Sequence, residues 1–426
     1  MHRPPISVSL IGLILGLGTS LVPLTSSAQT SSPTTPPTTS PTPALQPRPI
    51  DPTALAADDT AQIDALIDRM EKAVLADDQS AYLACVDPIS PEFMMEQRHW
   101  AADLSNHRPV VFGIEITSPL EPESFVSAAP GADSVPALRA ARATMRMTWK
   151  LPKGKSRSVT YTARFLNRDG QWRYAGEAWT SISSADGQNI VRFLDPKLAD
   201  AADRVVKVMP IVREHVETGF GSSLDHPQVI KLYTSMRHLQ QSIYLSYVES
   251  LGGWNEPGEA IKILADPKSS ENQLKRLLAH EYGHVATFSF DPHASEHMPW
   301  WAAEGVAELA AERFTGAKAV QRVDRIVRAW AQTGELADWD KMADFRSTPL
   351  SLYSKVYTQS HHFIGWLSEQ YSRDARNTWI RELAQGVPLD KATRDAFGSE
   401  FEVLDNQWQQ SLEKPESAPS QNESPD

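Results

Sequence analysis

The sequence predicts an α+β protein with two folded regions: helices followed by an antiparallel sheet, then a mainly helical region with a small sheet. Three observations lead to this prediction. The chain has 426 residues, 41% of them hydrophobic, which is long for one domain and enough for two cores. Apolar and polar residues alternate through 142–150 and 158–165, as in strands. Beyond residue 190 most apolar residues recur at helical spacing.

The two ends of the chain are predicted to lie outside both cores. Residues 1–28 have the form of a signal peptide, with an apolar stretch over 6–22 and small residues before a cleavage site. An uncleaved anchor is the alternative, but the stretch is short and broken by Gly and Ser. Residues 29–55 predict a Ser/Thr/Pro-rich linker, and 414–426 a disordered acidic tail. We therefore expect an exported protein, periplasmic or secreted, without a stable membrane span after signal cleavage.

The net charge disfavours anionic partners, and the cysteine content excludes stabilisation by internal disulfides. The formal net charge is −12, so nucleic acid and anionic membrane surfaces are poor partners for the chain. Cys85 is the only cysteine, so an exported chain has no internal disulfide and depends on packing. We expect Cys85 to be a buried apolar residue without a catalytic role.

Residues 56–188 are predicted to form the N-terminal region. The apolar residues at 63, 66, 67, 70 and 74 share one face of a helix. Strand patterns follow, and "RDG" at 168–170 predicts a hairpin turn between the last two. One or two helices followed by a curved antiparallel sheet resembles the cone-like α+β fold of the nuclear-transport-factor-two-like and SnoaL-like modules. That resemblance rests on element order and implies an accessory domain that binds a ligand or mediates contacts.

Residues 189–413 are predicted to form the C-terminal region. Its elements are a long helix kinked at Pro210, a strand over 227–234, a helix ended by Gly252 and Gly253, a strand over 258–266, and mostly helices from Trp300 to Leu412.

The helix that follows the second of these strands carries the sequence "HEYGH" at 280–284. It begins with a capping-box signature at Ser270. His280 and His284 lie one turn apart on the same face, so both imidazoles can bind one metal ion. Glu281 can reach a water on that ion without binding the metal itself. The pattern predicts two zinc ligands and a general base; two surface histidines are the alternative.

A catalytic zinc ion needs a third protein ligand and one open position. No histidine stands six residues after the second one, and His293 and His297 in the following loop are poor candidates. The helix predicted over 298–314 carries Glu304 and Glu308 one turn apart among apolar residues, where a carboxylate needs a partner. We predict Glu304 as the third ligand, with Glu308 accepting a hydrogen bond from a ligand histidine. Two solvent-facing glutamates are the alternative.

"HEYGH", nineteen further residues and then "EGVAE" together resemble the gluzincin metallopeptidases of the peptidase-MA-like group. Their zinc-binding core is H-E-x-x-H with a downstream glutamate, commonly in a W-x-x-E-G-x-A-type helix, which here reads "WAAEGVAE". The resemblance implies one zinc ion per chain, bound by His280, His284 and Glu304. It also implies Glu281 as general base, Glu308 as the residue orienting a ligand histidine, and a peptide or protein substrate.

The same resemblance implies a downstream tyrosine or histidine that stabilises the oxyanion of the tetrahedral intermediate. In "YSKVYTQSHHFIGWLSEQYS" Tyr357 matches best and Tyr353 second, and His361 and His362 are further options.

Aminopeptidases of this group carry a G-x-M-E-N strand that captures the free amine of the substrate. This chain has "GGWNEPG" at 252–258, in which the order differs. Glu256 remains an option for binding an amine. A more general role is strand addition of an extended peptide to "EAIKIL" at 259–264. That role favours an endopeptidase over an aminopeptidase.

These inferences predict an exported zinc metallopeptidase that hydrolyses peptide bonds with a zinc-activated water, Glu281 as general base and Tyr357 as oxyanion donor. A ligand- or wall-binding protein with a degenerate or structural zinc region is one alternative. A zinc hydrolase of non-peptide substrates is another. An intact Glu281 argues against a structural site, which has no use for a base.

Overall fold

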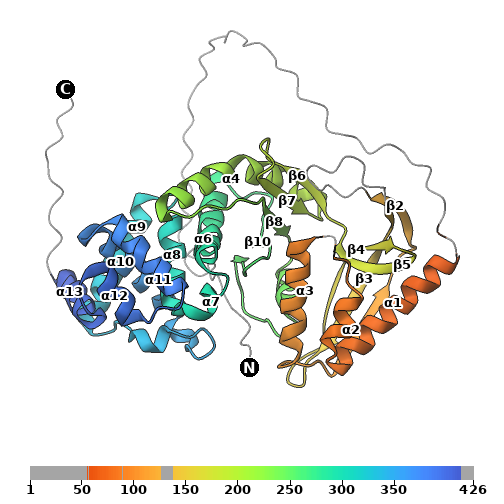
Figure 1. Ribbon diagram of the computed structural model, residues 1–426, viewed down its shortest axis with the longest axis horizontal. Coiled ribbons are helices and arrows are strands. Elements are labelled where there is room, and N and C mark those ends of the chain that lie inside the picture. Colours follow the sequence, from red (N-terminus) through yellow and green to blue (C-terminus); the bar gives the residue numbers. More distant parts are fainter. Residues whose placement is uncertain (1–54, 56, 89, 126–137, 414–426) are drawn as a thin grey trace, which may run out of the picture.

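The computed structural model describes residues 55, 57–88, 90–125 and 138–413 (Figure 1). The predicted signal peptide, linker and acidic tail lie outside the described residues. The described chain is a mixed α+β protein with one sheet in each of two regions and a helical C-terminal part, as predicted. No helix in the described part of the chain combines the length and apolar character that crossing a bilayer requires.

The N-terminal region consists of three helices and one antiparallel sheet. The helices are α1 (Ala57–Ala76), α2 (Gln79–Ala84) and α3 (Pro91–Leu104). The strands are β1 (Val111–Ile116), β2 (Glu121–Phe125), β3 (Leu138–Lys150), β4 (Arg157–Arg168) and β5 (Gln171–Glu177), in the order β1-β3-β4-β5 with β2 also on β3. The predicted apolar face of α1 is buried against this sheet, in a core that includes Cys85. The resemblance to cone-shaped modules stays a prediction.

The second sheet has mixed strand directions. Its order is β6 (Thr180–Ser183), β7 (Asn189–Phe193), β8 (Gln228–Tyr233), β10 (Ile261–Leu264) and β9 (Gly253–Trp254). The three central strands are parallel, and both edge pairs are antiparallel. The boundary predicted between residues 188 and 189 falls inside the β6–β7 hairpin. Because β6 pairs with this sheet, we call residues 180–413 the C-terminal region.

Two further expectations differ from the structure. The helix predicted to reach Gly252 ends much earlier, since α5 spans Met236–Ile243 and residues 244–252 lie outside regular elements. The strand expected to accept a peptide, β10, pairs with β8 on one side and β9 on the other. Both of its edges are therefore occupied, and β9 is the edge strand instead.

Helices fill the remainder of the C-terminal region. They are α4 (Ala199–Phe220), α6 (Glu271–Phe290), α7 (Ala294–His297), α8 (Trp300–Glu312), α9 (Ala317–Thr333), α10 (Tyr353–Gln370), α11 (Arg373–Ala384), α12 (Leu389–Phe397) and α13 (Phe401–Glu413), with 3-10 turns η2 (Pro196–Leu198), η3 (Trp339–Met342) and η4 (Leu350–Leu352). Pro210 lies inside α4, which continues through it. The capping box predicted at Ser270 is present and begins α6.

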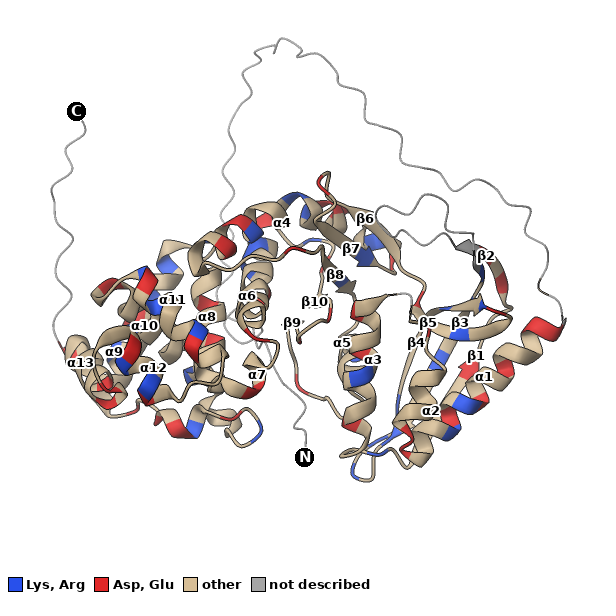
Figure 2. Cartoon of the chain, viewed as in Figure 1, with Lys and Arg blue, Asp and Glu red and all other residues tan. Residues whose placement is uncertain are grey.

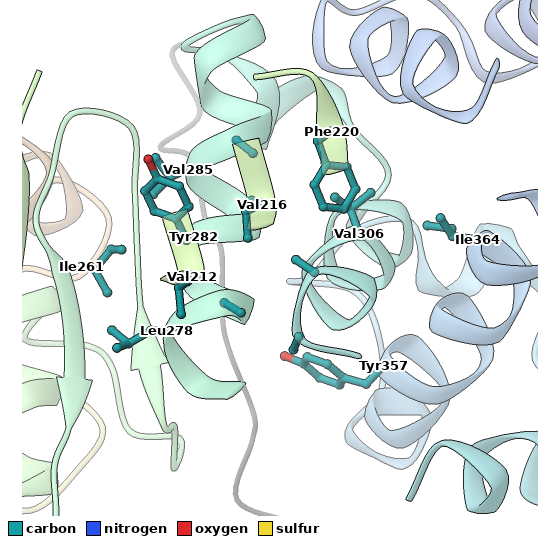
Figure 3. Close-up of a cluster of buried hydrophobic side chains, with 14 of the residues drawn as sticks. Val212, Val216, Phe220, Ile261, Leu278, Tyr282, Val285, Val306, Tyr357 and Ile364 are labelled. Atoms are coloured by element: carbon teal, nitrogen blue, oxygen red, sulfur yellow. The ribbon is translucent and has the colours of Figure 1, made fainter. Parts of the chain in front are cut away.

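Helices α4, α6, α8 and α10 pack together around one apolar core, which Figure 3 shows in close-up. Two glycines permit their close approach. A Cβ on Gly283 of α6 would lie 2.9 Å from the Cα of Ala307, and one on Gly305 of α8 would lie 2.8 Å from the Cβ of Ser360. Contacts this short exclude any larger residue at either position without movement of a helix. Gly283 thus lets α6 and α8 come near enough for their polar side chains to meet, and Gly305 allows the close approach of α8 and α10.

Candidate metal centre

Helices α6 and α8 bring three of the predicted site residues to one point. The Nε2 atoms of His280 and His284 lie 3.4 Å and 3.6 Å from Oε2 of Glu304. One ligand atom from each of the three residues lies within 4.8 Å of the other two. All three side chains are at most 1% exposed. They meet because the two histidines lie one turn apart on α6 and face the first turns of α8.

The spacing and chemistry of this cluster fit a zinc ion. Two ligand atoms at about 2.0–2.1 Å from a tetrahedral zinc lie roughly 3.4 Å apart. The observed separations of 3.4 Å and 3.6 Å are close to that value. Nε2 of His284 and Oε2 of Glu304 are buried and have no hydrogen-bond partner among the described residues. Buried polar atoms left in this way are costly, so a cation between them would satisfy both.

Two side chains outside the cluster orient the ligands. Oε1 of Glu308 lies 3.1 Å from Nδ1 of His280, which is the contact predicted for it, and Arg276 lies 3.5 Å from the other Glu308 oxygen. The indole Nε1–H of Trp300 donates to Oε1 of Glu304 at 2.8 Å and leaves Oε2 for a metal. These contacts to His280 and Glu304 fix the orientation of two of the three ligands toward the ion.

The electrostatics of the metal-free cluster favour a proton on His280. Burial lowers the pKa of His280, but the carboxylates of Glu304 and Glu308 outweigh it and raise that pKa to about 10. Burial raises the pKa of Glu308, while its contact with His280 lowers it to about 2. The pKa of Glu304 is likewise lowered, because the two histidines outweigh its burial. Binding of a metal ion must therefore displace a proton from His280.

Glu281 lies fully buried beside the cluster and in contact with the edge strand β9. A Cβ on Gly253 would lie 2.3 Å from Oε1 of Glu281, so a larger residue there would displace the Glu281 carboxylate. The side-chain amide of Asn255 donates to the backbone carbonyl of Glu281 at 3.3 Å. The strand therefore fixes the position of the predicted general base.

The candidates for an oxyanion donor lie at different distances from the cluster. The ring of Tyr357 lies 6.2 Å from that of His280, centroid to centroid, whereas Tyr353 packs on Trp300 at 4.9 Å. His361 is bound to Glu312 at 2.6 Å, and His362 to Asp324 at 3.0 Å. Tyr357 therefore has the better position, and the two histidines have partners elsewhere.

The remaining candidates do not join the cluster. Nδ1 of His297 lies 2.9 Å from the carbonyl of Ala384, and His293 lies beside Glu296. Glu256 is fully buried in the loop after β9.

A cavity of about 300 Å³ opens beside His284. Large apolar side chains and charged groups both line it. The large apolar residues are Phe288, Met298, Trp300 and Phe345, and the charged ones are Glu296, Asp344 and Arg346. Because the cavity reaches a candidate metal ligand, it offers room for part of a substrate.

Residues 208–414 match the family model of the Peptidase MA superfamily. The match contains α6, α8 and α10, and hence every residue of the cluster. Together, the Peptidase MA match and the His-His-Glu cluster indicate a metallopeptidase-like enzyme with a zinc site.

Two individual proteins are also similar to this chain. The uncharacterized protein YhcO of Bacillus subtilis (strain 168) is 23% identical over 192 residues, which are 41% of this chain and 55% of YhcO. The chain thus spans little more than half the length of this curated relative. The structure of native yeast LTA4 hydrolase aligns with a TM-score of 0.36 and 12% identity, over 73% of this chain and 48% of that one.

Three residues that hold the site in place were not predicted from the sequence. Gly253 and Asn255 lie in the stretch examined for amine binding, but their contacts with Glu281 depend on a sheet edge that no local pattern reveals. Trp300 carried a usable signal, since it stands four residues before Glu304 and therefore on the same helix face.

Proposed function

We propose that this chain is an exported zinc-dependent metallopeptidase that hydrolyses peptide bonds. The observation that carries the proposal is the buried His280, His284 and Glu304 cluster, whose spacing fits zinc, within the Peptidase MA match. Export rests on the signal-peptide pattern of residues 1–28.

In the proposed reaction, each residue of the site has one task. His280, His284 and Glu304 would hold a zinc ion, which would supply Lewis-acid activation of a water molecule and of the substrate carbonyl. Glu281 accepts the proton of the attacking water and passes it to the leaving amine. Tyr357 donates its hydroxyl hydrogen to the oxygen on which negative charge develops. Glu308 and Trp300 keep His280 and Glu304 in position through the contacts described above.

We propose an endopeptidase in preference to an aminopeptidase. The order of residues in 252–258 departs from the strand that captures a free amine in aminopeptidases. The cavity beside His284 contains Phe288, Trp300 and Phe345 among its lining residues, which supports a substrate with a large side chain next to the cleaved bond.

The test is the variant Glu281→Gln in the purified mature chain. We expect hydrolysis to fall by about 10²–10⁴-fold, because the water loses its proton acceptor. Zinc content should stay at about one ion per chain, since Glu281 is not a ligand. The matched control is Glu271→Gln, which changes an exposed glutamate at the start of the same helix and should keep wild-type activity.

Cleavage is read by mass spectrometry after digestion of a peptide library, which also reports the position of the cut. Wild-type hydrolysis by Glu281→Gln would remove this residue from the mechanism. If the zinc-loaded wild-type chain cleaves no peptide, the site would instead be that of a zinc hydrolase with a non-peptide substrate.

A further inference from the structure

Residues 244–256, between α5 and β10, contain β9 and lie against Glu281; we call them the covering segment. We propose that the N-terminal region acts as a clamp that holds the covering segment against the metal site. Trp149 and Arg157 are then positioning residues for a reaction in which neither touches the substrate. This inference rests on the proposed function for its effect on catalysis, but not for its effect on the segment.

The N-terminal region contacts the backbone of the covering segment directly. The indole Nε1–H of Trp149, on β3, donates to the carbonyl of Leu245 at 3.0 Å. Arg157, at the start of β4, donates through Nη1 to the carbonyl of Tyr247 at 3.2 Å. The side chain of Leu245 is buried in the core of the N-terminal region rather than in that of its own region. The start of the segment is thus bound by side chains about 90 residues away.

Helix α5, which leads into the covering segment, is held from the same side. Trp100 of α3 donates its indole hydrogen to the carbonyl of Gln241 at 3.1 Å. The ring of His238 stacks on that of Tyr161 with 4.8 Å between centroids. Figure 2 shows α3 and α5 next to each other at the junction of the two regions. Both the helix and the segment after it therefore rest on the N-terminal region.

An aromatic cluster links the clamped start of the segment to its far end. The rings of Tyr244 and Tyr247 lie 5.8 Å and 5.4 Å from that of Trp254, both with edge-to-face geometry. Trp254 is only 1% exposed, and its neighbours Gly253 and Asn255 make the contacts with Glu281. Because packed aromatic rings resist displacement, the position of residue 247 constrains the position of residue 253.

Buried ion pairs fix the two regions relative to each other. The ammonium of Lys231 on β8 lies 2.5 Å from the carboxylate of Glu96 on α3. Glu259 lies 2.9 Å from Lys262 on β10 and 2.7 Å from His99 on α3. Separating the regions would break the Lys231–Glu96 pair and the contact between Glu259 and His99, and loss of a buried ion-pair partner is strongly unfavourable. The N-terminal region is therefore held in a fixed position relative to the second sheet.

The covering segment has few hydrogen bonds of its own. Most of it lacks regular secondary structure, so its backbone carbonyls have few donors within the segment. Trp149 and Arg157 supply two of these donors. Without them the start of the segment, at residues 245 and 247, loses its hydrogen bonds to the N-terminal region, while β9 keeps its pairing with β10.

The test compares two tryptophan variants of the full chain. Trp149→Phe removes the donor to Leu245 and keeps a ring in the core. Trp172→Phe is the matched control, since Trp172 is equally buried in the same region but donates to Asp59, away from the segment. Amide hydrogen exchange is followed by mass spectrometry, together with zinc content, kcat and KM.

We expect Trp149→Phe to speed exchange over 244–256 by roughly 10-fold, because a buried carbonyl loses its donor. Exchange over α6 and α8 and the zinc content should stay unchanged, and kcat should fall while KM changes little. Trp172→Phe should leave exchange over 244–256 and kcat as in the wild type. Equal effects of both variants, or unchanged exchange over 244–256 in Trp149→Phe, would overturn the clamp.

A second pair of variants keeps the test valid if Trp149→Phe does not fold. Arg157 is partly exposed, so Arg157→Ala is tolerated more easily, and Arg157→Lys restores a donor. We expect faster exchange over 244–256 in the alanine variant and partial recovery in the lysine variant. Because exchange does not depend on catalysis, it tests the clamp even if the wild-type chain cleaves no peptide, whereas a failed proposed function would appear only in the kinetics.

Discussion

The N-terminal and C-terminal regions both bury carboxylates, but they neutralise them in different ways. Glu96, on α3, is 4% exposed and lies 2.5 Å from the ammonium of Lys231. Glu304, on α8, is fully buried, and its Oε2 faces the imidazoles of His280 and His284. The first carboxylate has a permanent cation of the chain beside it. The second has two side chains that serve equally as bases and as metal ligands.

This difference distinguishes a buried carboxylate that stabilises the fold from a buried carboxylate that can bind a ligand. A buried lysine–glutamate pair is complete, and its disruption leaves an uncompensated charge. A buried carboxylate between two histidines is complete only when a proton or a metal ion lies among them. In the metal-free chain the raised pKa of His280, about 10, indicates that a proton has this role. A zinc ion would replace that proton and add three strong bonds.

The largest expected effect is that of Glu304→Gln on zinc affinity. Zinc binding at a four-ligand site is worth about 10–16 kcal/mol, so loss of one ligand costs roughly 3–4 kcal/mol, or ~10²–10³-fold in affinity. Competition with a chelator measures it. Glu312→Gln, two turns further along α8 and bound to His361, is the control and should bind zinc as the wild type does. Wild-type affinity in Glu304→Gln would exclude it as a ligand.

The second effect is on stability and compares the two glutamates directly. Glu96→Gln removes the carboxylate that pairs directly with the buried ammonium of Lys231 and should cost about 3 kcal/mol of unfolding free energy. In the metal-free chain, Glu304→Gln leaves no permanent charge behind and should cost less than about 1 kcal/mol. Thermal unfolding of both variants in the presence of a chelator makes the comparison. Equal losses would contradict the distinction between the two sites.

A smaller effect is expected from the side chains that orient the ligands. Trp300→Phe keeps the aromatic packing on Phe345 and Tyr353 but removes the hydrogen bond to Glu304, so zinc should bind about 10–100-fold more weakly. Glu308→Gln should have an effect in the same range. Trp301→Phe is the matched control, because the neighbouring Trp301 packs on Trp339 instead. If Trp301→Phe weakened zinc binding as much, the hydrogen bond would not be the cause.

The smallest effect is a loosening of the junction between the regions in acid. Burial raises the pKa of Glu177, but His238 and Lys231 outweigh it and lower the pKa to about 2, from an ordinary value of 4.5. A lowered pKa in the folded chain means that this stabilisation is complete above pH 4.5 and is lost as the pH falls toward 2. Exchange over α5 should therefore rise in this window before exchange over α12, which is far from the junction (Figure 1), does. Simultaneous loss of both would refute the prediction.

Local spacing predicted the parts of the site that lie on single helices. His280 and His284 follow from a separation of four residues, and Glu304 follows from an apolar helix that leaves a carboxylate in need of a partner. The contact of Gly253 with Glu281 follows from no such pattern, because it requires β9 to be a sheet edge. Strands were predicted over 227–234 and 258–266, where β8 and β10 lie, but β9 and the pairing of the three strands were not, and the wrong edge was expected to bind peptide.

The β6–β7 hairpin limits how far the chain can be truncated from its N-terminus without disturbing the second sheet. The family match begins at residue 208, inside α4, and so omits both strands of this hairpin together with the whole N-terminal region. A fragment cut at that point would expose the edge of β8 to pairing with other chains. It would also leave Lys231 and Lys262 without Glu96. The residues that match the family model are thus fewer than the residues that complete the sheet and its buried ion pairs.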